Sequence, residues 1–218
     1  MCIRDSPSHA RKLLAAAARD ALPKGLLTPY LIRQLQLFGD PELDRQLREV
    51  FPGVSLIGAD RLASIEKWRR NLQPEKLKEA SPASGRKLFG EACGACHRLF
   101  GEGGTVGPEL TGAQRGELGY WLENILDPSG IVPQNFRMSV VRLKDGRVLT
   151  GVLGRQRGRT ITLQTPKEKL LLDQEQVAEV KPTALSLMPD GLLDQLKPEQ
   201  VRDLLSYLMS PGQVEPAD

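Results

Sequence analysis

Two cysteines and a histidine stand at the spacing that holds a c-type haem. The stretch reads Cys93-Gly94-Ala95-Cys96-His97, which is the pattern CxxCH. Two thiols one turn apart can bond the vinyl groups on one porphyrin edge, while the adjacent imidazole ligates the iron. Roughly 4 chance matches are expected in 10,000 chains with this Cys and His content. The pattern therefore predicts covalent haem attachment at Cys93 and Cys96, with His97 as an iron ligand.

Other interpretations of the cysteine pair are open. A CxxC pair also occurs as a thioredoxin-type dithiol, as a structural disulfide and as half of a zinc site. A dithiol of that type follows a strand in a βαβ unit, and no such pattern precedes Cys93. A zinc site needs further ligands, and the remaining cysteine and histidine are Cys2 and His9, near the start of the chain. Haem attachment is therefore favoured.

A sixth iron ligand would have to come from His9, Met138, Met188 or Met209. Met138 belongs to an alternating stretch that a strand explains, and Met209 lies on the apolar stripe of a predicted helix. Met188 lies in the non-helical segment 186–189, where a side chain can point at a cofactor. We therefore expect Met188 to be the sixth ligand.

Helices dominate the predicted elements. Residues 9–78 carry helical periodicity interrupted by proline and glycine, typical of the end of a helical-repeat region or of a plain helical linker. A short helix over 84–92 leads into the motif, and amphipathic helices are predicted over 117–126 and 198–209. The glycine-rich loop 101–112, between the predicted helices 84–92 and 117–126, can lie flat against a planar cofactor.

Residues 136–182 have the alternating pattern of a small antiparallel β unit. Asp145-Gly146 predicts a type I′ hairpin turn. The basic residues of this unit include Arg147, Arg155, Arg157 and Arg159. They either bind an acidic redox partner or form a solvated strand face, and the solvated face is favoured. The predicted strands cover residues 138–143, 147–153, 160–164, 169–172 and 177–180.

Composition excludes several classes of function. Lys and Arg outnumber acidic residues by 30 to 27, so no nucleic-acid partner is expected. No apolar run approaches the roughly 18 residues of a transmembrane segment. No other acid-base or nucleophilic constellation indicates a catalytic site in this chain.

Haem attachment of this kind takes place outside the cytoplasm, so the protein is expected to be periplasmic or otherwise exported. The apolar run 13–18 is too short for a signal peptide, and none is identified in this sequence. Residues 1–6, MCIRDS, look like a translated sequencing adapter. Residues 1–8 are therefore expected to be an artefactual or disordered start.

Three motifs together resemble a class I-type cytochrome c. They are Gly85-x-x-x-Phe89-x-x-x-CxxCH, the run Gly107-Pro108-Glu109-Leu110-Thr111-Gly112, and Met188-Pro189 followed by a helix with Leu204 and Tyr207. More narrowly, residues 120–129, 145–147 and 186–192 resemble the haem-binding domain of planctomycete and verrucomicrobial type. The resemblance covers about residues 80–211. Such domains usually end long exported proteins, behind β-propeller dehydrogenase-like and helical-repeat regions.

The resemblance, together with the helical periodicity of residues 9–78, predicts a mainly α fold: a cytochrome c-like helical haem domain with a small antiparallel β insertion and an N-terminal helical segment. The haem domain would be discontinuous, over 79–135 and 183–212, with the insertion at 136–182, the helical segment at 9–78 and a disordered tail at 213–218. In cytochromes c the first and last helices cross, so Gly85 and Phe89 should meet Leu204 and Tyr207.

The resemblance also extends the candidate haem site. In cytochromes c the carbonyl of the Gly-Pro motif accepts a hydrogen bond from the proximal histidine, which gives this role to Pro108. Leu110, Trp121, Ile125 and Leu187 would bury the ring. With the attachment residues and Met188, the expected set that binds the single covalent haem c is Cys93, Cys96, His97, Pro108, Leu110, Trp121, Ile125, Leu187 and Met188.

These residues predict electron transfer. Histidine and methionine together leave the iron no open position, and a thioether ligand raises the reduction potential. The expected setting is the C-terminal electron-accepting domain of a larger exported protein, whose partner is a redox protein or an upstream dehydrogenase domain. The alternative is a haem with a labile sixth ligand that acts in peroxidase or ligand-sensing chemistry.

Overall fold

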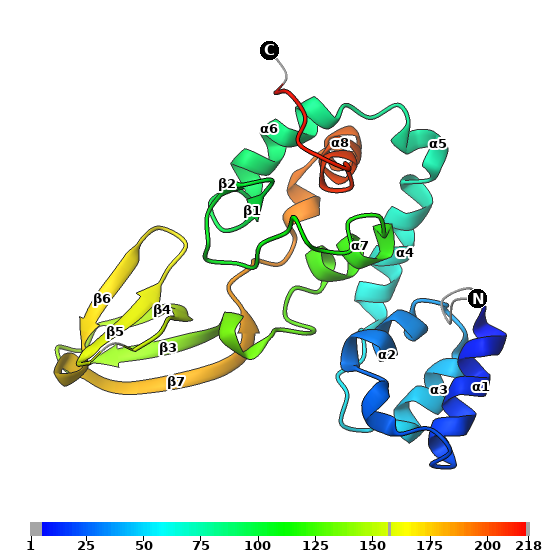
Figure 1. Cartoon of the computed structure of the whole chain (residues 1–218), viewed down its shortest axis with the longest axis horizontal. Coiled ribbons are helices and arrows are strands. Elements are labelled where there is room, and N and C mark those ends of the chain that lie inside the picture. Colours follow the sequence, from blue (N-terminus) through cyan, green and yellow to red (C-terminus); the bar gives the residue numbers. More distant parts are fainter. Residues whose placement is uncertain (1–5, 157, 217–218) are drawn as a thin grey trace. The chain divides into compact units, whose positions relative to one another are not determined.

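The computed structural model describes residues 6–156 and 158–216, so Cys2, most of the adapter-like stretch and Arg157 lie outside the described residues. Its contacts divide the chain into two compact units, one ending at Glu66 and the other beginning at Lys67 (Figure 1). The boundary falls inside helix α4 (Ala59–Asn71). Among the described residues, no helix is both long and apolar enough to cross a bilayer.

The first unit contains α1 (Pro7–Ala18), the short 3-10 helix η2 (Lys24–Leu26), α2 (Pro29–Gln36) and α3 (Pro41–Val50). The three α-helices share one start signal, a proline in the first turn behind a capping side chain from Ser6, Thr28 or Asp40. Both α1 and α2 pack against α3. Helices predicted for this segment are confirmed, and α1 begins at Pro7, two residues before the expected start. The core comprises Ala10, Leu14, Ala17, Leu27, Ile32, Leu35, Leu43, Leu47 and Phe51.

The second unit begins in α4 and contains further helical elements. They are α5 (Pro74–Leu77), α6 (Pro82–Ala92), α7 (Leu118–Leu126), the 3-10 helix η5 (Leu192–Gln195) and α8 (Pro198–Leu208). The helices predicted over 84–92, 117–126 and 198–209 are confirmed as α6, α7 and α8. Each of α6 and α8 has a proline at its first turn.

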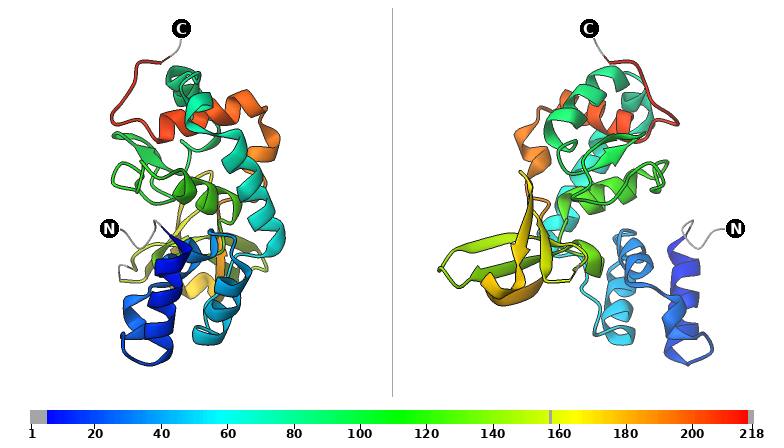
Figure 2. Two further views of the ribbon diagram at one scale, coloured as in Figure 1. Left: turned by 90° about the vertical axis from the view of Figure 1, so that its right-hand side faces the viewer. Right: turned by 60° about the vertical axis from the view of Figure 1, so that its left-hand side comes forward.

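Helix α8 packs against α6, as the turned views in Figure 2 also show. A Cβ atom on Gly85 would lie 2.0 Å from the Asp203 carbonyl oxygen and 2.8 Å from Tyr207 Cβ, so only glycine permits this approach. The Phe89 and Tyr207 rings meet edge to face, with centroids 5.6 Å apart. The expected contacts of Gly85 and Phe89 with Tyr207 are therefore present.

The end of the chain is better anchored than the sequence predicts. The Tyr207 hydroxyl donates to Gln213 Oε1 at 2.8 Å, and the Arg86 guanidinium donates to the Val214 carbonyl oxygen. Residues 213 and 214 therefore do not form a disordered tail, because side chains of α6 and α8 hold them.

A five-stranded antiparallel sheet lies between α7 and η5 in the sequence. Its strand order is β6-β5-β4-β3-β7, and its core consists of Val141, Leu143, Leu163 and Leu172. All five predicted strands are confirmed, but β7 extends to Ser186, beyond the expected end of the β unit at 182. A complete sheet also means that the mainly α class holds only loosely. The elements are η3 (Gln134–Phe136), β3 (Arg137–Leu143), β4 (Val148–Leu153), β5 (Thr160–Gln164), β6 (Lys169–Asp173), η4 (Gln174–Gln176) and β7 (Val177–Ser186).

The hairpin between β3 and β4 has a different turn from the predicted one. A type I′ turn needs positive φ at both Asp145 and Gly146, but φ is positive only at Gly146, where it is 90°. The Gly146 amide donates to the Leu143 carbonyl at 3.0 Å, and the Leu143 amide donates to the Arg147 carbonyl at 2.9 Å. The loop is therefore a three-residue hairpin closed by a left-handed glycine, and the type I′ prediction is wrong.

Two of the arginines that could bind an acidic partner form ion pairs with neighbouring carboxylates. Arg147 pairs with Asp145 at 2.8 Å, and Arg159 pairs with Glu175. Both pairs are exposed and lie within the β unit. Local neutralisation of this kind favours the solvated-face interpretation.

Candidate haem site

The CxxCH motif forms one turn at the end of α6. The Cys93 amide donates to the Phe89 carbonyl at 2.8 Å, which closes the helix. The His97 and Cys96 amides then both donate to the Cys93 carbonyl, at 2.9 and 3.1 Å. The backbone thus holds two thiols and one imidazole within a single turn.

Both thiols are free and half-buried. Burial, with a smaller contribution from Cys96, raises the pKa of Cys93 to about 12, and burial also raises the pKa of Cys96. A redox dithiol needs the opposite, a thiol whose pKa is lowered so that the thiolate forms near neutral pH. The protein environment therefore disfavours thioredoxin-type chemistry at this pair.

The imidazole of His97 is oriented by Pro108. Its Nδ1 atom lies 2.9 Å from the Pro108 carbonyl oxygen, so the contact implied by the resemblance is present. A carbonyl only accepts, so Nδ1 carries the proton and Nε2 keeps its lone pair for a metal. Burial lowers the pKa of His97, although the Pro108 carbonyl opposes the effect. Burial therefore favours the neutral ring, which is the form that metal ligation requires.

Gly107 lies against the His97 ring and was missing from the predicted set. A Cβ atom there would lie 2.5 Å from Cε1, 2.8 Å from Nδ1 and 2.9 Å from Nε2 of the ring. The Gly107 amide also donates to the Cys96 carbonyl at 2.8 Å. The Gly-Pro pair was a usable signal, but only its proline was interpreted.

The loop after the motif contains a hairpin that was not predicted from the sequence. Strands β1 (Arg98–Leu99) and β2 (Glu102–Gly103) pair through a two-residue turn with φ of 51° at Phe100 and 85° at Gly101. Positive φ at both positions is the mark of a type I′ turn. The signal was hidden because a phenylalanine occupies a position that favours Asn, Asp or Gly.

Glycines in this loop lie against the backbone of the motif. A Cβ atom on Gly103 would lie 2.1 Å from the His97 carbonyl oxygen, and one on Gly104 would lie 2.1 Å from that of Ala95. The Gly104 amide donates to the Gly94 carbonyl at 2.8 Å. We expected glycines here so that the loop could lie flat against the cofactor, whereas these two permit the loop to pack on the motif itself.

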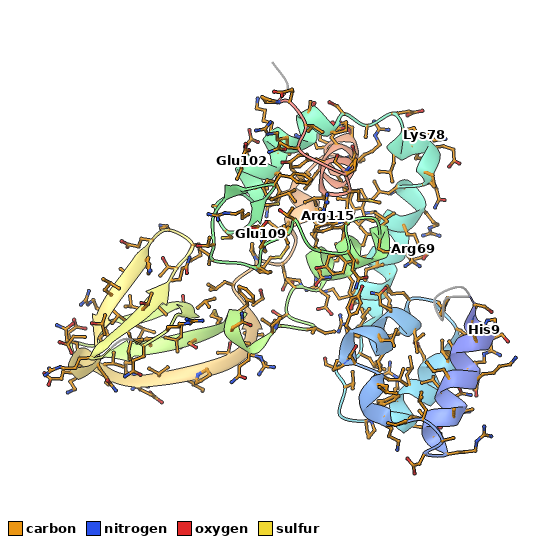
Figure 3. The ribbon with its side chains drawn as sticks, in the orientation of Figure 1. His9, Arg69, Lys78, Glu102, Glu109 and Arg115 are labelled. Carbon is orange, nitrogen blue, oxygen red and sulfur yellow. The ribbon has the colours of Figure 1, made fainter. Side chains whose placement is uncertain are left out.

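Phe100 connects the hairpin to the rest of the second unit. Its amide donates to Thr111 Oγ1 at 2.8 Å. The Arg115 guanidinium lies 4.7 Å from the centre of its ring, and the Tyr207 ring lies 6.1 Å away. Figure 3 labels Arg115 and, on the same loop, Glu109, whose carboxylate accepts the Thr111 amide at 3.2 Å. These contacts tie the segment after the motif to the α6–α8 pair.

The residues expected to bury the haem ring lie on separate elements. Leu110 lies two residues after Pro108, and its amide donates to the Arg98 carbonyl at 2.8 Å. Trp121 and Ile125 lie on one face of α7, and the Trp121 indole donates to the Arg115 carbonyl at 3.1 Å. All three side chains are buried, and their contacts with the haem stay predictions.

The four candidates for the sixth ligand have different surroundings. Met188 is half-buried in the bend between β7 and η5, next to half-buried Leu187. Met209 lines a hollow with Leu72, just after α4, Leu77 of α5 and Leu118 of α7, which agrees with the packing role expected for it. Met138 lies in β3, and His9 lies in the first unit. Met188 stays the predicted ligand.

The residues of the motif fit a covalently bound haem. The donor set comprises two thiols and one imidazole, all on one turn. The Nδ1 atom of the imidazole contacts Pro108, which leaves Nε2 for the iron. Gly107 leaves room beside the imidazole that any larger residue would occupy. Formation of two thioethers and ligation of iron by Nε2 is therefore compatible with this local structure.

Comparison with protein families gives one match. Residues 82–140 match the family model of cytochrome c, a segment that contains α6, the CxxCH motif, Pro108 and α7. The match supports a cytochrome c domain, and such a domain carries a covalently bound c-type haem with iron and transfers electrons through it. Met188 lies beyond the matched residues. The search of curated proteins found no match.

Proposed function

We propose that this chain carries electrons through a haem attached at Cys93 and Cys96 and ligated by His97 and Met188. The observation that supports this most strongly is the 2.9 Å contact between His97 Nδ1 and the Pro108 carbonyl oxygen. It orients the imidazole and leaves Nε2 available beside two thiols. When bound, the haem supplies a reversible ferric–ferrous couple.

The protein residues have distinct roles in this proposal. Cys93 and Cys96 fix the position of the porphyrin edge, and Pro108 keeps the proton on Nδ1 of His97. Trp121 and Ile125, with Leu110 and Leu187, exclude water and keep the local dielectric constant low. The soft thioether of Met188 favours the ferrous state and fills the position at which a substrate would otherwise bind.

We also propose that this domain accepts electrons at the C-terminal end of a larger exported protein. Support comes from the resemblance of residues 80–211 to domains placed in that way, and from the extracytoplasmic site of haem attachment. The partner would then be an upstream dehydrogenase domain or a separate redox protein. Recovery of the upstream reading frame tests the setting: a propeller region agrees with it, and a signal peptide directly before residue 9 contradicts it.

The visible spectrum of exported, haem-loaded protein tests the ligation. We expect a low-spin spectrum with a weak ferric band from the methionine–iron bond, and a pyridine haemochrome spectrum typical of two thioethers. Met188→Ala should abolish the band and lower the midpoint potential. Met209→Ala is the matched control, because its side chain lines a separate hollow, and should leave both unchanged.

Two outcomes would contradict the proposal. A five-coordinate, high-spin ferric spectrum in the unaltered protein would show a vacant sixth position and favour peroxidase or ligand-sensing chemistry. Retention of the methionine band in Met188→Ala would show that another side chain ligates the iron.

A further inference from the structure

We infer that Ser129 and Ser186 are positioning residues that hold the backbone of Met188 in place. The inference rests on the function proposed above, because it concerns how the sixth ligand is presented. Ser129 comes just after α7, and Ser186 is the last residue of β7. Neither serine was among the predicted site residues.

Two hydrogen bonds in series connect Ser129, in the segment after α7, to Met188. The Ser186 amide donates to Ser129 Oγ at 3.1 Å, across 57 positions of sequence. The Met188 amide then donates to Ser186 Oγ at 3.0 Å. Each bond fixes a backbone group, so together they constrain the direction in which the chain leaves the sheet.

Strand pairing within the sheet also fixes the position of Ser186. Ser186 pairs with Arg137, the first residue of β3. The Thr183 hydroxyl donates to the Met138 carbonyl at 2.8 Å and accepts the Leu185 amide at 3.1 Å. Ser186 is therefore fixed both by the strand pair and by Ser129.

The chain beyond Met188 is anchored again within a few residues. Gly191 adopts a φ of 74°, and its carbonyl accepts the Asp194 amide at 3.1 Å at the start of η5. Leu193 in η5 is only 1% exposed, and η5 packs against α7. Met188 thus lies in a short segment that is held at both ends. Before it, Ser186 is bonded to Ser129, and after it, η5 packs against α7.

A short span with fixed ends limits how far Met188 can withdraw. Loss of one hydrogen bond of ordinary net strength should raise the population with a displaced methionine roughly threefold to tenfold. An added ligand that competes for iron then binds with a correspondingly tighter apparent affinity. The effect requires no change in the residues that attach the haem.

Imidazole binding to the ferric, haem-loaded protein tests the inference. Ser129→Ala and Ser186→Ala should each tighten the apparent imidazole affinity about threefold to tenfold and weaken the methionine–iron band. Ser129→Thr keeps the hydroxyl and should restore both. Ser210→Ala is the matched control, because it removes a hydroxyl bonded to the Ser206 carbonyl at 2.9 Å in the α8 region.

Amide hydrogen exchange gives a readout independent of the iron. Ser186→Ala should speed exchange at Met188, whose amide loses its acceptor, and Ser210→Ala should not. Faster exchange in both variants, or in neither, would overturn the inference.

The spectra separate this inference from the proposed function. If Met188→Ala abolishes the methionine band while both serine variants bind imidazole like Ser210→Ala, the positioning role is wrong and the ligation stands. If the unaltered protein shows no band that depends on Met188, the ligation is wrong and the positioning role falls with it.

Discussion

Replacement of Gly107 by alanine should displace the ring of His97, the proposed iron ligand, without replacing any of the proposed ligands. The added Cβ atom would lie 2.5 Å from His97 Cε1, whereas ordinary contacts begin near 3.4 Å. The ring or the loop must therefore move by about 0.9 Å, the difference between these two distances.

That displacement is large compared with the tolerance of the Pro108 contact. The contact measures 2.9 Å, and a hydrogen bond is effectively lost once the distance grows by about 0.6 Å. Loss of a hydrogen bond that orients a metal-binding histidine typically lowers the metal affinity or the activity about 10- to 100-fold. Because a less basic imidazole stabilises ferric iron less, a tenfold preferential loss in that state raises the potential by about 59 mV.

The assay compares haem-loaded Gly107→Ala with the unaltered protein. We expect a lower yield of haem-loaded protein, a higher midpoint potential and a lower unfolding temperature, since overpacking costs about 1–3 kcal/mol. Gly112→Ala is the control on the same loop, because a Cβ atom there meets nothing within 4 Å. If the two variants have the same potential and unfolding temperature, the steric reasoning is wrong.

Two further substitutions test other parts of the structure. Gly85→Ala should prevent α6 from reaching α8, since its Cβ atom would lie 2.0 Å from the Asp203 carbonyl oxygen; we expect at least the 1–3 kcal/mol loss typical of overpacking, on the order of several degrees in thermal unfolding. Gly90→Ala on the same helix has open space and should be neutral or slightly stabilising, so equal losses in the two variants would contradict the packing argument. In the first unit, hydrogen bonds from Arg11 and then from the α3 amides lower the pKa of Asp40. A lowered carboxylate pKa contributes stability above the unfolded value of about 3.9 and loses it as the pH falls through the folded value. Asp40→Asn keeps a capping side chain, so its deficit in unfolding temperature should be present near neutral pH and shrink below about pH 4; a deficit that does not change with pH would refute the ion pair.

Prediction from the sequence succeeded where the signal was local. The helices separated by proline and glycine and the alternating strands each depend on neighbours within a few residues. The contact between His97 and Pro108 was also accessible, because a known motif carried it. The type I′ turn at Asp145-Gly146 was wrong because the same dipeptide also fits a three-residue loop with one left-handed glycine.

Features that depend on distant partners escaped prediction. The role of Gly107 follows from the position of the His97 ring, and the bond between Ser129 and Ser186 joins residues 57 positions apart. No periodicity in the sequence indicates that a serine will bond a distant backbone amide. A phenylalanine at positive φ, as at Phe100, also departs from the residues that usually occupy such turns. These choices become interpretable only when the partner atoms are in place.

The arrangement of β3 and β7 explains how a whole sheet can stand between two proposed iron ligands. The first residue of β3, Arg137, pairs with the last residue of β7, Ser186, so the chain leaves and returns at adjacent points. The loop from Ser129 to Ser186 is closed by a hydrogen bond at the same place. For the residues around α7, the sheet is therefore equivalent to a short connection, because only the separation of its ends affects the path toward Met188. A change in the length of the β5–β6 hairpin should then leave the proposed ligation intact, whereas a change at either end of the sheet should alter it.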